Sequence, residues 1–157
     1  MRLLADTTYL LPAVGVWPRG ASELIPRLLG RAEVLLISEI TLFELSAKGS
    51  KYVSQGSLKA EAVAEGIKAV LNDDRIEIIP MLRTLSSSTP TILRGMVDDY
   101  VDCIILSAAL HEGDALVTED RLLLSLQDDS RFRQLSDGVN PGFKILKMGQ
   151  ILGEQSV

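Results

Sequence analysis

Four acidic residues lie within or directly beside apolar stretches of the sequence, where a carboxylate is unusual. Asp6 ends the apolar start RLLAD, Asp120 follows the apolar run ALVT, and Asp102 begins the apolar stretch DCIILSAAL. Glu44 lies in SEITLFEL, in the helix expected to follow the apolar run EVLLIS. Asp6 and Asp120 could each cap a helix through their side-chain oxygens, and the helix dipole favours Asp102 near a helix start. Taken singly, each aspartate therefore has a structural explanation.

Glu44 is harder to explain as a surface charge. We expect Ile40, Phe43 and Ala47 to share the inward face of a helix, and Glu44 falls on that face. Glutamate is rarely buried unless it is paired or binds a metal ion. Lys48 is the nearest basic residue in the sequence, and it could extend into solvent instead of neutralising Glu44.

The elements that must position these residues alternate along the chain. Apolar runs predict strands at residues 2–6, 33–38, 114–118 and 143–146, and the alternating, β-branched stretch RIEIIP predicts a strand at 75–80. Helical spacing predicts helices at residues 21–31, 39–47, 58–71, 100–112 and 121–126, with loops at 86–90 and 127–142. Strands of this kind alternating with helices are typical of an α/β fold whose parallel sheet is covered on both faces. The length of 157 residues favours a single domain over residues 1–157.

A parallel sheet brings the four carboxylates to one place. Ligands of such sheets bind outside the carboxyl ends of the strands, near the point where strand order reverses. Like charges gathered there repel one another unless a cation neutralises them. Oxygen ligands suit Mg²⁺ or Mn²⁺, and Mg²⁺ is often completed by substrate phosphate oxygens. The sequence therefore predicts phosphoryl chemistry in which a metal ion activates water and stabilises the leaving oxygen.

The composition excludes several other classes of protein. With one cysteine and one histidine, the chain has no internal disulfide, no Ser-His-Asp or Cys-His mechanism and no histidine-rich metal cluster. A net charge of −5 argues against a protein that coats nucleic acid with a basic face, although it allows a nucleic-acid substrate. No apolar run approaches the roughly 20 residues that span a bilayer. The N-terminal stretch is not expected to be a signal peptide, because Asp6 interrupts its apolar region. We expect a cytoplasmic protein without membrane contact.

Four motifs, in this order, resemble those of the PIN-domain ribonucleases, among them the VapC-like toxins. LADTTYLL is similar to the opening strand with its Asp followed by Ser or Thr, and SEITLFEL to the helix that carries the second acid. DCIILSAAL is similar to the third motif, an Asp heading a helix, and LVTED to the closing Thr-x-Asp. The resemblance implies a three-layer α/β/α sandwich with a central five-stranded parallel sheet.

The resemblance also implies an activity and its residues. It implies an endoribonuclease that depends on Mg²⁺ or Mn²⁺, with Asp6, Glu44, Asp102 and Asp120 as the catalytic metal site. Thr7 and Thr118 would support this site by hydrogen bonds, and Asp98, Asp99 and Glu119 are candidates for outer-sphere contacts. It further implies the toxin of a type II toxin–antitoxin pair: a homodimer with an RNA substrate and an antitoxin protein as its partner.

Alternatives to a toxin stay open at this point. The fold could serve as a catalytically inactive module that binds RNA or protein, or as an RNA-processing nuclease that is not a toxin. A phosphotransfer protein fits less well. A dehalogenase-like phosphatase needs a second Asp at the position where this chain has Thr8. A receiver domain needs acidic residues that the second and third predicted strands do not supply.

Two further groups of residues are candidates for binding surfaces. RNA contacts are expected from basic residues of the early helices, namely Arg19, Arg27, Arg31, Lys48 and Lys51. A dimer or antitoxin surface is expected from the apolar residues Leu10, Leu11, Val14, Val16 and Trp17.

Overall fold

The computed structural model describes residues 1–17 and 24–153, and a parallel sheet forms its centre. Within these residues the sheet has five strands in the order β3-β2-β1-β4-β5, and all the pairs are parallel. The strands are β1 (Arg2–Ala5), β2 (Val34–Ser38), β3 (Ile76–Ile79), β4 (Ala115–Val117) and β5 (Lys144–Leu146). The predicted fold class and all five predicted strands are confirmed.

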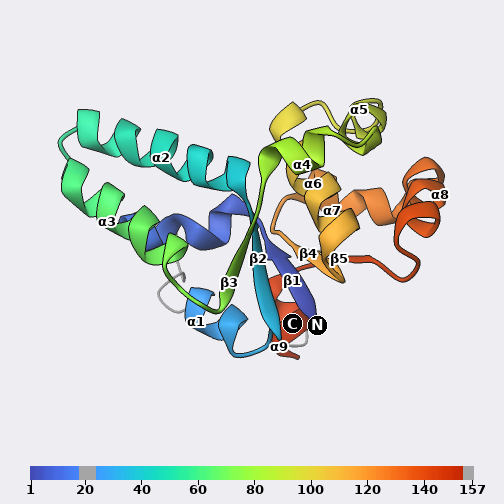
Figure 1. Cartoon of the computed structure of the whole chain (residues 1–157), viewed down its shortest axis with the longest axis horizontal. Helices are drawn as coiled ribbons and strands as arrows, with labels where there is room; N and C mark the ends of the chain where they lie inside the picture. Colours follow the sequence, from blue (N-terminus) through green and yellow to red (C-terminus); the bar gives the residue numbers. More distant parts are fainter. Residues whose placement is uncertain (18–23, 154–157) are drawn as a thin grey trace.

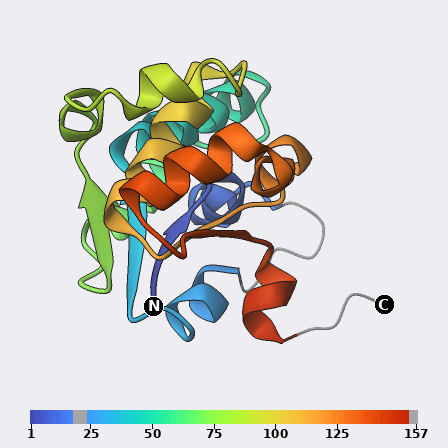
Figure 2. The ribbon, with the colours of Figure 1, turned by 90° about the vertical axis from the view of Figure 1, so that its right-hand side faces the viewer.

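Helices cover both faces of the sheet (Figure 1). The elements η1, α2 and α3 lie on one side, and α4 to α8 lie on the other, where Figure 2 shows α8 in front of α6. The helices are η1 (Thr7–Val14), α1 (Leu24–Leu29), α2 (Glu39–Ser54), α3 (Ala60–Leu71), α4 (Met81–Leu85), α5 (Thr89–Leu93), α6 (Tyr100–Glu112), α7 (Arg121–Ser125), η2 (Leu126–Asp128), α8 (Ser130–Val139) and α9 (Met148–Leu152).

The apolar runs of the strands supply both sides of the core. Successive strand residues point to opposite faces of a sheet. Leu4 and Leu116 accordingly pack on the side of α6 and α8, whereas Leu3 and Ala115 pack on the side of η1, α1 and α9. All four side chains are fully buried, which explains why β1 after Arg2 and the whole of β4 are apolar and do not alternate with polar residues.

The order of the strands determines where a site can form. The chain moves from β1 outward to β2 and β3, and then returns to the other side of β1 to form β4. In the register of β1 and β4, Ala5 lies opposite Val117. The residues that follow these two, Asp6 and Thr118, therefore emerge side by side at the point where strand order reverses.

Several helices differ from the prediction. The helix expected at 39–47 continues to Ser54 in α2, and the stretch 127–142 contains the helix α8 where a loop was expected. The sequence of α8 is polar because it buries only Phe132 and Ser136, which leaves little apolar pattern to detect. Of the helix expected at 21–31, residues 21–23 lie outside the described part, and α1 ends at Leu29.

The expected loop at 86–90 is shorter in the structure, since α5 begins at Thr89 with Pro90 in its first turn. Proline is tolerated there because the first helical N–H groups have no partner within the helix. The short helix α9 follows β5 and was not predicted. In residues 1–17 and 24–153, no helix combines the length and the apolar character that crossing a membrane requires.

A close contact between α3 and η1 gives a test of this packing. A Cβ atom added at Gly66 would lie 1.9 Å from the carbonyl oxygen of Ala13. We expect Gly66→Ala to lower the free energy of unfolding by about 3 kcal/mol or more, because backbone must shift to admit the methyl group. Urea unfolding in the presence of chelator measures this change.

Gly138→Ala in α8 is the matched control, because its added Cβ atom would meet nothing within 4 Å. It should raise the free energy of unfolding by up to about 1 kcal/mol, since alanine favours the helix. Equal stability of the two variants would contradict the packing described here.

Candidate functional site

Asp6 is buried at the junction of β1 and β4 and is held by two donors. The Thr118 hydroxyl donates to Asp6 Oδ2 at 2.7 Å, and the Thr7 backbone N–H donates to Asp6 Oδ1 at 2.7 Å. Burial raises the pKa of Asp6 above its ordinary value, although both hydrogen bonds act to lower it. The cap expected of an aspartate here is present, but Asp6 also faces the pocket described below.

Glu44 reaches the same place from α2, where the Thr7 hydroxyl donates a hydrogen bond to its Oε2. The inward face predicted for this helix is correct for Ile40, which is half-buried against the core, and wrong for Phe43 and Ala47. The residues that α2 buries are Thr41, Leu45 and Gly49, whereas Phe43 is 66% exposed and Ala47 is exposed. Glu44 is half-buried beside the true inward face, and it is turned toward Thr7 and not into the core.

Asp102 lies in the first turn of α6, and Asp99 caps that helix by accepting the Val101 N–H at 2.8 Å. The pKa of Asp102 is raised to about 7, first because burial removes water from the carboxylate. The negative charges of Asp99, Asp6, Asp120 and Glu44 add to this rise, in decreasing order. The carboxylates predicted to converge therefore lie near enough to repel one another.

Asp120 caps α7, since its Oδ1 accepts the backbone N–H groups of Leu122 at 2.7 Å and Leu123 at 3.1 Å. Its own backbone N–H donates to the Thr118 hydroxyl at 3.0 Å. Thr118 thus accepts from Asp120 and donates to Asp6, which couples the end of β1 to the start of α7. Asp120 can therefore cap α7 and belong to the candidate site at the same time.

These side chains line one pocket of about 370 Å³. Six of its lining residues are acidic, and Lys48 is its one basic lining residue within the described part of the chain. The lining consists of Asp6, Thr7, Thr8, Glu44, Lys48, Asp99, Asp102, Glu119 and Asp120. Thr118 lies beneath it, fully buried, and Asp98 does not line it. The structure therefore brings together eight of the nine residues considered for the site, all except Asp98.

Tyr9 was not predicted to belong to the site. Its side chain is almost fully buried, and its hydroxyl donates to Glu119 Oε1 at 2.6 Å and accepts the Met148 N–H at 3.3 Å. Burial, together with the nearby Glu119 carboxylate, raises the pKa of Tyr9. The signal in the sequence is weak: a buried tyrosine needs a partner for its hydroxyl, but only the fold shows that Glu119 is that partner.

The donor set of this pocket fits a hard divalent cation. Its groups are carboxylate and hydroxyl oxygens, which Mg²⁺ and Mn²⁺ prefer. Among the described residues, no group of three or more Asp, Glu, His or Cys side chains is arranged to hold a metal ion directly. Mg²⁺ does not require such a group, because it keeps several waters and binds through one or two carboxylates. The remaining carboxylates would then act through water.

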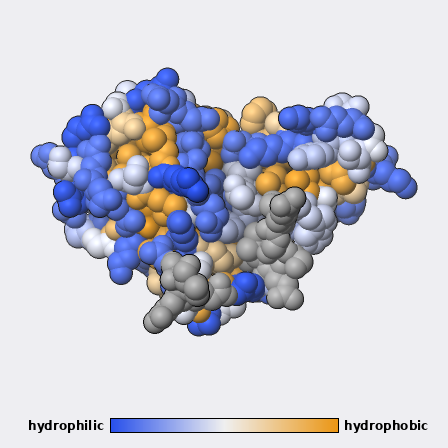
Figure 3. Space-filling view, turned by 180° about the vertical axis from the view of Figure 1, so that it is seen from behind, coloured by the Kyte–Doolittle hydropathy of each residue, from blue (hydrophilic) through white to orange (hydrophobic). Residues whose placement is uncertain are grey.

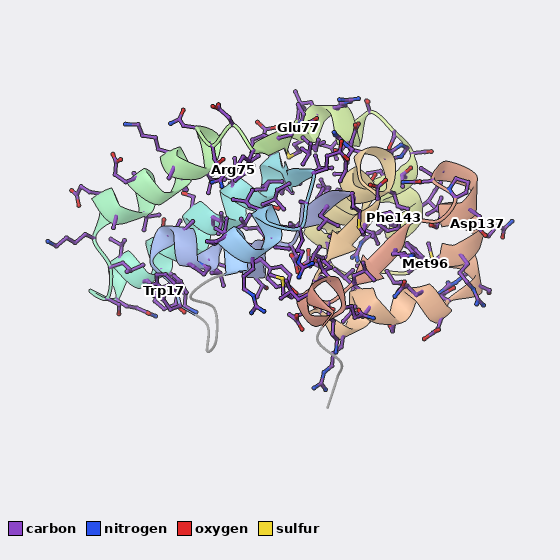
Figure 4. All side chains as sticks on the ribbon, turned by 90° about the horizontal axis from the view of Figure 1, so that it is seen from below. Trp17, Arg75, Glu77, Met96, Asp137 and Phe143 are labelled. Carbon is purple, nitrogen blue, oxygen red and sulfur yellow. The ribbon has the colours of Figure 1, made fainter. Side chains whose placement is uncertain are left out.

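The candidate binding surfaces are only partly compatible with the structure. Leu10 and Val14 are fully buried in the core, so the prediction that they form a surface is wrong. Trp17 is 61% exposed and lies at the end of the part formed by η1, α2 and α3 (Figure 4). Arg31 precedes β2 and so lies at the amino ends of the strands, whereas the pocket lies at their carboxyl ends. Arg19 lies outside the described residues.

The raised pKa of Asp102 predicts how stability depends on pH without metal. The folded protein holds a proton on Asp102 up to about pH 7, whereas an unfolded aspartate loses its proton near pH 4. Folding therefore loses stability as the pH rises from about 4 through 7. In chelator, we expect Asp102→Asn to unfold at a higher temperature than wild type at pH 8, with a smaller difference at pH 5. Each kcal/mol of change in the free energy of unfolding shifts the unfolding temperature by about 2–4 °C in a chain of this size.

Scanning calorimetry measures the difference, with Asp137→Asn on the exposed surface of α8 as the control. A gain in stability that is the same at both pH values would mean that Asp102 is not held protonated in the folded protein.

The position of Thr118 predicts a second effect on stability. Thr118→Val removes the donor to Asp6 and the acceptor for the Asp120 N–H while keeping the size of the side chain. We expect a loss of about 1–3 kcal/mol in the free energy of unfolding, because buried polar groups are left unpaired. Thr118→Ser keeps the hydroxyl and should lose less free energy of unfolding than Thr118→Val, as measured by urea unfolding. A larger loss for Thr118→Ser than for Thr118→Val would refute the role given to the hydroxyl.

Comparisons with known proteins agree with this fold. The crystal structure of VapBC2 from Rickettsia felis, bound to a DNA fragment from their promoter, is similar in fold, with a TM-score of 0.56 and 21% sequence identity. The match covers 94% of this chain and 98% of that chain. A comparison with curated proteins gave no match. The model of the PIN domain family matches residues 3–128, a range that contains all four predicted metal ligands. This chain belongs to the PIN domain family.

Proposed function

We propose that this protein is an endoribonuclease that hydrolyses RNA phosphodiester bonds with Mg²⁺ or Mn²⁺ held, directly or through its bound waters, by Asp6, Glu44, Asp102 and Asp120. PIN domains are generally nucleases, and PIN nucleases generally use divalent metals. The observation that carries the proposal is the pocket itself, where six carboxylates face one lysine and the pKa of Asp102 is raised to about 7. Such an excess of negative charge is costly unless a cation binds there.

The residues of the pocket have distinct tasks in this proposal. Thr118 and Thr7 hold the Asp6 carboxylate so that its remaining lone pairs face the pocket, and the Thr7 hydroxyl orients Glu44. A divalent ion bound here would supply an activated water and stabilise the leaving oxygen. Asp102 would release its proton to solvent on binding the ion, so metal binding would weaken below about pH 7. Lys48 offers a positive charge to a substrate phosphate beside these acids.

The partners follow from the family and from the similar structure. That structure is a VapBC2 complex on promoter DNA, which favours for this chain the role of a toxin with an antitoxin partner, and we propose a homodimer as its active form. An RNA-processing nuclease without an antitoxin would use the same site. A catalytically inactive module is disfavoured, because binding alone gives no reason to keep so many repelling carboxylates in one pocket.

Cleavage of a panel of single-stranded and structured RNAs tests the activity. Wild type should cleave in Mg²⁺ or Mn²⁺ and not in excess chelator. Asp102→Asn should lower kcat/KM by about 100-fold or more, because it removes a carboxylate at the metal. Asp137→Asn should cleave like wild type, and unfolding curves show that each variant is folded.

Titration calorimetry with Mn²⁺ separates a missing substrate from a missing activity. Binding to wild type that is lost in Asp102→Asn, without cleavage of any RNA in the panel, would point to an exacting substrate. Wild type that binds no Mn²⁺ at pH 8 would refute the proposed mechanism.

A further inference from the structure

A second, smaller pocket adjoins the acidic pocket. It has a volume of about 270 Å³ and is lined by Leu11, Val16, Lys48, Lys51 and Tyr52. Lys48 lines both pockets, so they share a wall. We call this second pocket the Tyr52 notch.

Helix α2 leads from the acidic pocket to the Tyr52 notch. Glu44, Lys48 and Tyr52 are spaced four residues apart, which places them on successive turns of one side of the helix. Lys51 follows Lys48 by three residues and belongs to the same side. At 1.5 Å per residue, Tyr52 lies about 12 Å along the helix from Glu44.

The lining of the Tyr52 notch suits a nucleotide. Leu11 and Val16 are half-buried apolar residues, and Tyr52 is 37% exposed. No carboxylate of the described residues lines the notch, in contrast to the acidic pocket beside it. Within residues 1–17 and 24–153, neither Lys48 nor Lys51 forms an ion pair. Bases stack on exposed aromatic rings, and lysines bind the phosphates that flank them.

The other apolar pocket on α2 lacks this combination. It lies between α2 and α3, has a volume of about 550 Å³, and is lined mainly by serine and aliphatic side chains with Lys68 as its one basic residue. It shares no lining residue with the acidic pocket. Seen from behind, the part of the molecule that contains η1, α2 and α3 shows hydrophobic surface between hydrophilic borders (Figure 3). Of the two pockets, the Tyr52 notch is the one connected to the candidate active site.

We propose that the Tyr52 notch is a subsite for one base of the RNA substrate, next to the phosphate that is cleaved. This inference rests on the proposed function and adds the part of the substrate that is recognised. Tyr52 stacks on the base, Leu11 and Val16 exclude water from its edge, and Lys48 and Lys51 hold the flanking phosphates. The two lysines also offset the repulsion that the acidic pocket exerts on RNA.

RNA binding tests the subsite separately from cleavage. Fluorescence anisotropy with a labelled, mixed-sequence single-stranded RNA is measured in Mg²⁺ on the Asp102→Asn background, so that the RNA stays intact. Tyr52→Ala should raise Kd about 10-fold, because one stacked base is lost, whereas Tyr52→Phe should leave Kd nearly unchanged. Lys51→Gln should weaken binding and reduce the slope of log K against log salt concentration by about 1, which corresponds to one lost phosphate contact. Lys144→Gln, at the start of β5 on the opposite edge of the sheet, is the matched control and should bind like its parent.

Cleavage of RNAs that carry one abasic residue locates the recognised base. With wild type, kcat/KM should fall about 10-fold when the abasic residue occupies one particular position beside the cleaved bond. Tyr52→Ala should cleave intact RNA more slowly by the same factor and should be insensitive to an abasic residue at that position. Equal sensitivity of both proteins would overturn the proposal that Tyr52 contacts this base.

The outcomes distinguish the two proposals. If wild type cleaves RNA and Tyr52→Ala matches it in Kd and kcat/KM, the subsite is refuted and the proposed function stands. If RNA binding depends on Tyr52 but wild type neither binds Mn²⁺ nor cleaves RNA, the contact of Tyr52 with a base stands and the proposed function fails. If Tyr52→Ala changes self-association in sedimentation and leaves RNA binding unchanged, the notch is an interface between copies of the chain, and the subsite is refuted.

Discussion

The hydrogen bond from the Thr118 hydroxyl to Asp6 joins the ends of two adjacent strands, and the candidate site is arranged around it. It exists because β1 and β4 pair in a register that places Ala5 opposite Val117. The same hydroxyl accepts the N–H of Asp120 and so positions the start of α7. One fully buried threonine thus orients a carboxylate of β1 and the cap of a helix that begins after β4.

The electrostatics of the pocket oppose folding in the absence of a cation. Burial raises the pKa of both Asp6 and Asp102, and neighbouring carboxylates raise that of Asp102 further. Hydrogen bonds from Thr7 and Thr118 offset part of this cost at Asp6, and Lys48 offsets a further part. The chain therefore holds its acidic groups in place through backbone N–H groups and hydroxyls, and the remaining repulsion favours cation binding. Natural proteins commonly accept such a loss of stability where function requires it.

Helix α2 connects the chemistry to substrate recognition. Its first half presents Glu44 to Thr7, and its second half presents Lys48, Lys51 and Tyr52 beside η1. The length of α2 matters here, because a helix that ended at residue 47 would not carry the second group. The side of α2 that faces the core is formed by small or apolar residues, including Gly49, where an added Cβ atom would lie 2.5 Å from the Val63 side chain. Close packing of α3 against α2 therefore fixes the orientation of the side that bears the lysines.

The sequence by itself determined the strands, the helix at 100–112 and the four carboxylates that the sheet brings together. Continuous apolar runs and the positions of Asp6, Asp102 and Asp120 at the ends of strands or the starts of helices are local properties, so they can be read without the fold. The tertiary structure decided which side of α2 is inward, because Phe43 and Thr41 differ in burial only through what packs against the helix. It also decided that Tyr9 binds Glu119 and that Lys48 separates two pockets. These contacts join residues far apart in the chain, and no local pattern specifies which distant side chain will be the partner.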